Sequence, residues 1–138
     1  MHRVNWWAIV VSAIAFFLFG WLWYGVLFAH AWYMAIGKSE QQTTGGGASV
    51  SPFALSLVMA FFLSYGLARI LSWRGEMTPL RGAFIGFSAG VLIFGTMTWM
   101  DYAFEMRPGS LLAINVGDVA IGMAIVGAIL GAWKPKPN

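Results

Sequence analysis

The side chains that could do chemistry are few, and most of them lie in the last third of the sequence. Asp101 and Glu105 are four residues apart, so they share one face of a helix. Asn115 and Asp118 are three residues apart and share a face in the same way. The candidate set, in chain order, is His30, Asp101, Glu105, Arg107, Asn115 and Asp118. Because clustered carboxylates in a low-dielectric setting share protons or attract cations, this pattern predicts an outward-facing proton or cation site.

A structural interpretation of the same residues stays open. Glu105 would pair with Arg107 at the water interface, and Asp101 would reach lipid headgroups. Asp118, deeper in its segment, would hydrogen-bond Asn115 or a Ser or Trp of a neighbouring helix. His30, Asp101 and Glu105 do not have the spacing of a metal-ligand motif, so we expect no metal ion and no cofactor. No nucleophile motif or phosphate-binding loop occurs in the sequence, and we expect no catalytic residue.

The composition decides which elements carry these residues. Of the 138 residues 59% are apolar and 9% are charged, and there is no cysteine. A soluble domain is about 45–50% apolar and about 25% charged, and a chain of about 150 residues buries only about 70% of its unfolded surface. The composition therefore excludes a soluble enzyme, a nucleic-acid-binding protein and a disordered tail. It predicts an integral membrane protein without disulfides.

Four apolar stretches are long enough to cross a bilayer, which takes roughly 20 residues. They cover residues 6–28, 52–73, 80–104 and 111–133 of a single membrane domain, 1–138. The alternation of a barrel strand is absent, so helices must satisfy the backbone in hydrocarbon. We predict an all-α transmembrane four-helix bundle with up-down-up-down topology and both termini on the same side.

Local signals mark the ends of these helices. Asn5, Thr78 and Ser110 are expected N-caps, and Pro79 suits a first helical position. Gly37 is the expected C-cap of a helical extension that follows the first span. Residues 38–50, rich in Gly, Ser, Gln and Thr, predict a flexible loop.

Basic residues are distributed unevenly between the two sides of this topology. The side with the termini carries Arg3, Arg69, Arg74, Arg81, Lys134 and Lys136, and the opposite side carries Lys38 and Arg107. The positive-inside rule then predicts a multi-pass protein of the bacterial inner membrane with cytoplasmic termini. We expect membrane lipids as partners, and we do not expect the protein to bind nucleic acid.

Small residues recur at every fourth position in three of the stretches. These are Gly82, Gly86 and Gly90; Ser56, Ala60, Ser64 and Ala68; and Ala120, Ala124 and Ala128. Helices in lipid associate through close packing at such residues, so the stripes predict tight contacts within the chain or between copies, and we expect a homo-oligomer. Large side chains such as Phe16 and Phe61 are expected to face lipid or a second subunit.

Two blocks of the sequence carry a family resemblance. The first contains Val4-Asn5-Trp6, Gly20, Trp23-Tyr24-Gly25, Phe28, Trp32 and Gly37; the second contains residues 104–108, 111–117 and 127–133. Together they resemble a family of short bacterial four-helix membrane proteins catalogued as a domain of unknown function. The resemblance implies the four-helix fold and no particular activity, and it draws attention to Asn5, Trp23, Tyr24, Glu105, Arg107 and Asn115. Asp118 departs from the aromatic residue common at this place in that family.

The sequence thus favours a non-catalytic structural or accessory membrane protein, with any small ligand unknown. A small channel or proton-coupled transporter using the acidic cluster is the alternative. A lipid-modifying membrane enzyme is a third possibility, and it rests on the acidic residues alone.

Overall fold

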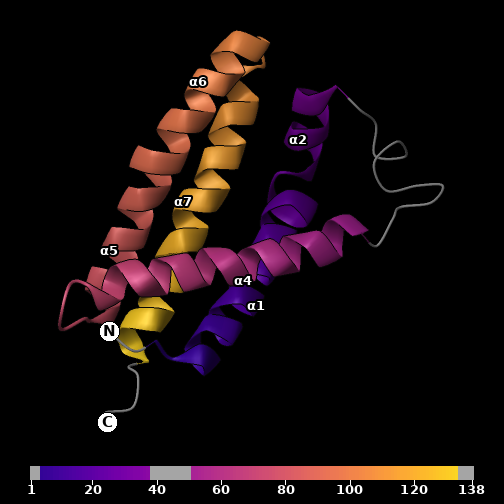
Figure 1. Ribbon diagram of the computed structural model, residues 1–138. Helices are drawn as coiled ribbons and strands as arrows, with labels where there is room; N and C mark the ends of the chain where they lie inside the picture. Colours follow the sequence, from indigo (N-terminus) through magenta and orange to yellow (C-terminus); the bar gives the residue numbers. More distant parts are fainter. Residues whose placement is uncertain (1–3, 38–50, 134–138) are drawn as a thin grey trace.

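The structure is a computed structural model that describes residues 4–37 and 51–133 (Figure 1). Within these two ranges every regular element is a helix, which confirms the predicted all-α bundle. The elements are α1 (Trp6–Leu22), η1 (Trp23–Leu27), α2 (Ala29–Ile36), α4 (Ser51–Ser72), α5 (Pro79–Ala89), η2 (Gly90–Gly95), α6 (Thr96–Glu105) and α7 (Gly109–Ala132), where η denotes a π-helical segment. The predicted loop 38–50 lies outside the described residues.

Four helical runs in the described part of the chain are long and apolar enough to cross a membrane. They are Trp6–Leu27, Pro52–Ser72, Pro79–Glu105 and Gly109–Ala132. The first and third runs each contain a π-helical segment, η1 and η2 respectively, where the helix widens but does not end. Four such runs are typical of a multi-pass membrane protein.

The helix ends follow from local chemistry at most of the expected positions. The Asn5 side chain accepts hydrogen bonds from two backbone N–H groups of the first turn of α1, at 3.1 and 3.2 Å. The Thr78 hydroxyl accepts from the N–H of Arg81 at 3.2 Å. Gly37 ends α2 in the left-handed conformation, with φ of 71°. These three predicted caps are confirmed.

The predicted N-cap at Ser110 is wrong. The α7 helix begins one residue earlier, at Gly109, after Pro108 in extended conformation, and no side chain caps it. Met106 has a positive φ of 56° and reverses the chain directly after α6. Because the turn is that tight, Ser110 falls inside the first turn of α7.

The helices pack unequally around α7. The α5 helix lies alongside α7, and α1 packs against the other side of α7, whereas α4 crosses both α1 and α7 at a steep slant (Figure 1). From Ala60 onward, α4 contributes the buried residues Ala60, Ser64, Leu67, Ala68 and Leu71. In contrast, every residue from 52 to 59, Ser56 included, is exposed. This first part of α4 is therefore left uncovered by the rest of the described chain.

The contact between α5 and α7 brings the two backbones together. A Cβ atom added to Gly82 would lie 1.9 Å from the carbonyl oxygen of Gly127, and one added to Gly86 would lie 2.1 Å from that of Met123. One added to Gly90 would lie 2.7 Å from the Cα of Ala120. Since no side chain fits in these places, glycine alone permits this approach. Farther along α7, Ala124 and Ala128 are half-buried.

The contact between α1 and α7 is built from rings on glycines. A Cβ on Gly122 would meet the Phe16 ring at 2.5 Å, and one on Gly117 would meet the Trp23 ring at 2.9 Å. The expectation that Phe16 faces lipid or another subunit is therefore wrong, because Gly122 leaves a hollow that the ring fills. Phe61 of α4 stacks near Trp6, with the ring centroids 6.5 Å apart.

Candidate functional site

Polar side chains within the spans meet where η1 faces α6 and α7, and Asn115 of α7 lies at their centre. The Tyr24 hydroxyl of η1 donates to the Asn115 Oδ1 at 2.7 Å. The Asn115 Nδ2 in turn donates to the hydroxyl of Tyr102 on α6. This chain, which we call the tyrosine–asparagine chain, gives each of three polar side chains a partner and links three helical segments. In hydrocarbon such interhelical hydrogen bonds hold helices in register.

A second hydrogen bond fixes η1 against α7. The indole Nε1 of Trp23 donates to the backbone carbonyl of Ile114 at 2.9 Å. The ring therefore packs on α7 while its only polar atom has a hydrogen-bond partner, which is usual for a tryptophan within a protein. The rings of Phe19 and Phe28 lie 5.5 and 4.5 Å from it, centroid to centroid.

The π-helical geometry of η1 places Trp23 and Tyr24. The N–H of Phe28 bonds to the Trp23 carbonyl, five residues back, at 2.9 Å. The wider turn shifts the side chains that follow it around the helix axis, relative to an unbroken α-helix of the same sequence. Single π turns of this kind occur frequently at functional sites.

Asp118 lies on the same side of α7, facing α1. Asp118 is only 7% exposed, and its Oδ1 has no hydrogen-bond partner among the described residues. Gly20 of α1 lies opposite, where an added Cβ would be 3.9 Å from that oxygen. A buried carboxyl oxygen without a hydrogen-bond partner is costly in hydrocarbon, and Asp118 is therefore a candidate functional group.

The C-terminal end of α6 carries a separate, solvent-exposed charge pair. The Arg107 Nε donates to the carboxylate of Glu105, and both side chains are 50% exposed. The Arg107 guanidinium also lies 5.4 Å from the centroid of the Tyr102 ring. An exposed ion pair contributes little to stability, but the cation–π contact places Arg107 over the end of the tyrosine–asparagine chain.

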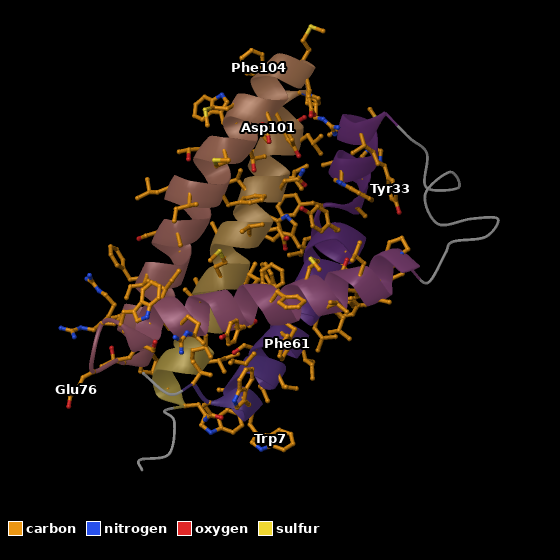
Figure 2. The ribbon with its side chains drawn as sticks, in the orientation of Figure 1. Trp7, Tyr33, Phe61, Glu76, Asp101 and Phe104 are labelled. Atoms are coloured by element: carbon orange, nitrogen blue, oxygen red, sulfur yellow. The ribbon has the colours of Figure 1, made fainter. Side chains whose placement is uncertain are left out.

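The predicted site residues are thus divided between two environments. Asn115 and Asp118 lie inside the bundle, whereas Asp101, Glu105, Arg107 and His30 are exposed; Figure 2 shows Asp101 on α6. Within residues 4–37 and 51–133, no three His, Asp or Glu side chains come close enough to hold a metal ion. The functional role of these residues remains a prediction.

Sequence reasoning did not pair Tyr24 and Tyr102 with Asn115. A signal was present, because a tyrosine hydroxyl or an amide inside an apolar span needs a hydrogen-bond partner. Three such groups in different spans therefore had to find one another or water. What was missing was the rotation of each helix about its axis, which the two π-helical segments change.

Four apolar helical runs, of which the first, third and fourth are joined by hydrogen bonds between groups within them, are typical of a multi-pass helical membrane protein. Residues 7–131 match the family described as "Protein of unknown function (DUF1761)", and the chain belongs to that family. The predicted resemblance to a family of unknown function is thereby confirmed. No curated protein and no solved structure matches the chain.

Proposed function

We propose that this chain is a non-catalytic structural or accessory protein that forms a homo-oligomer in the bacterial inner membrane, with both termini in the cytoplasm. The tyrosine–asparagine chain is the observation that carries the proposal. Its polar groups are occupied in joining η1, α6 and α7, which is a structural use of polarity at depth. The excess of basic residues on the terminal side supports the orientation.

The exposed first part of α4, residues 52–59, supports the homo-oligomer. The small residues Ala60, Ser64 and Ala68 are buried, and the same four-residue stripe continues outward to the exposed Ser56. A second copy of the chain would extend this close packing to residues 52–59, where the first copy offers no partner. The stripe, and not merely apolar exposure, is what favours a helix over lipid as the occupant.

Disulfide cross-linking in membranes tests the homo-oligomer, because the chain has no cysteine of its own. We expect Ser56→Cys to give a cross-linked dimer upon mild oxidation. Val58→Cys, on the opposite side of the same exposed turn, is the matched control and should remain monomeric. Equal cross-linking of both variants, or of neither, would contradict the proposed contact.

A second candidate function is proton-coupled transport or a small channel, and the buried Asp118 specifically favours it. In liposomes containing a pH-sensitive dye, such a protein would carry a proton flux that Asp118→Asn abolishes. Glu76→Gln, which neutralises an exposed carboxylate in the connection between α4 and α5, is the matched control and should leave the flux unchanged. An accessory protein would give no flux in any form, so absence of flux from the unsubstituted chain excludes this candidate.

A further inference from the structure

The connection between α4 and α5 lies at the end of the bundle where α1 begins and α7 ends (Figure 1). Together with the first turns of α5, this connection lines an open pocket of about 820 Å³. It combines two kinds of lining. Arg74 in the connection and Arg81 in the first turn of α5 supply positive charge, while Trp73, Leu80 and Phe84 supply apolar surface. Neither the tyrosine–asparagine chain nor Asp118 belongs to this pocket.

Both arginines line the pocket, and the position of Arg81 is fixed by a hydrogen bond. Arg81 donates from Nη1 to the backbone carbonyl of Glu76 at 3.4 Å, which holds its guanidinium beside the connection. The Glu76 side chain, the acidic group of the lining, projects from the connection away from the helices (Figure 2). The pocket therefore presents two cationic groups to a ligand and directs its carboxylate elsewhere. Guanidinium groups recognise phosphate through several N–H donors at once.

The apolar lining continues along α5. Leu80 and Phe84 are four residues apart, so they lie on one face of the helix, and they are 80% and 71% exposed. Trp73, 65% exposed, stands at the pocket edge, where tryptophan is favoured at the boundary between headgroups and acyl chains. A ligand here would need a charged head and an apolar tail.

We propose that this pocket binds the phosphodiester of an anionic glycerophospholipid, with Arg74 and Arg81 on the phosphate and an acyl chain along Leu80 and Phe84. A zwitterionic headgroup fits less well, because its cation would enter a region of two arginines. The inference requires that the chain spans a membrane with this connection at the interface. It depends on neither the accessory role nor the homo-oligomer.

Native mass spectrometry of the full chain in detergent, titrated with phosphatidylglycerol or phosphatidylcholine, tests the proposal. We expect phosphatidylglycerol to bind preferentially, and Arg81→Gln to weaken it about tenfold, the effect of losing one charge-assisted hydrogen bond. Arg74→Gln should act in the same direction. Arg107→Gln, the same substitution at the opposite end of the bundle, should leave binding unchanged.

Two further measurements distinguish a lipid phosphate from free phosphate and check that each variant is folded. Millimolar inorganic phosphate should not displace the lipid, because it lacks the acyl contact. Circular dichroism should show unchanged helix content in each variant. Equal binding of both lipids, equal loss in Arg107→Gln, or displacement by inorganic phosphate would overturn the proposal. Lipid binding that persists when Ser56→Cys fails to cross-link would separate this inference from the proposed homo-oligomer.

Discussion

The two sides of α7 use glycine for opposite purposes. On the side of α5, Gly127 and Gly131 lie against backbone, with added Cβ atoms 1.9 and 2.3 Å from carbonyl oxygens of the facing segment. On the side of α1, Gly117 and Gly122 receive aromatic rings. Backbone cannot withdraw from such a contact without moving a whole helix, whereas a ring can rotate or shift. The packing of α7 against α5 is therefore fixed, whereas the packing of α7 against α1 is adjustable because the rings can move.

The polar side chains of α7 avoid the close contact with α5. Asp118 faces α1, and Asn115 accepts a hydrogen bond from Tyr24 of η1 and donates one to Tyr102 of α6. The closest backbone approaches to α5 are instead at Gly82, Gly86 and Gly90. The comparison teaches that a small-residue stripe and a set of polar side chains can share one helix by occupying different faces.

The largest effect is expected for Gly82→Ala, which tests whether the contact between α5 and α7 is fixed. Its Cβ would overlap the Gly127 carbonyl, so we expect a loss of about 3 kcal/mol in stability, at the upper end for overpacking. Thermal unfolding in detergent measures it. Gly66→Ala on α4, where an added Cβ meets nothing within 4 Å, is the control and should be neutral or slightly stabilising. Similar losses in both variants would show that the α5 contact is not fixed.

A smaller effect is expected for Gly122→Ala on the adjustable side. The added methyl meets the Phe16 ring, which can move, so we expect a loss of about 1–2 kcal/mol. Phe16→Leu should relieve part of this loss when the two substitutions are combined, and a double-mutant cycle measures the coupling. If the two effects simply add, the ring does not fill the Gly122 hollow.

The smallest effect concerns the tyrosine–asparagine chain. Asn115→Leu removes the partner of both tyrosine hydroxyls, and we expect a loss of about 1 kcal/mol, typical of hydrogen bonds between membrane helices. Thr96→Val is the control, because the Thr96 hydroxyl bonds only to carbonyls of its own run. Equal unfolding temperatures for the two variants would mean that the chain does not join the helices.

The fold was predictable because its determinants are local. Span length follows from runs of apolar residues, and the ends at Asn5, Thr78 and Gly37 follow from side-chain or backbone chemistry within one turn. The predicted N-cap at Ser110 was wrong because the chain reverses at Met106, where φ is positive, and α7 begins at Gly109. The residue type of Met106 does not indicate such a tight reversal.

The candidate site was predictable only in part. Asn115 and Asp118 were identified because polar groups are conspicuous in apolar spans. Their environments depend on how η1 and η2 turn each helix and on where glycine leaves a hollow, and neither is encoded in residue spacing. For the same reason the sequence did not predict that the Phe16 ring packs against Gly122.

The π-helical segment η1 bears on how the length of related chains can vary. A π turn takes up one residue more than an α turn and leaves the residues after it on nearly the same side of the helix. Deleting one residue from Trp23–Leu27 would therefore convert the segment to ordinary α-helix with little rotation of residues 29–36. Homologous chains one residue shorter here would keep the side that α2 presents to α7, and the change would be confined to the aromatic corner where the Trp32 ring lies edge-on to Tyr24, with centroids 5.4 Å apart.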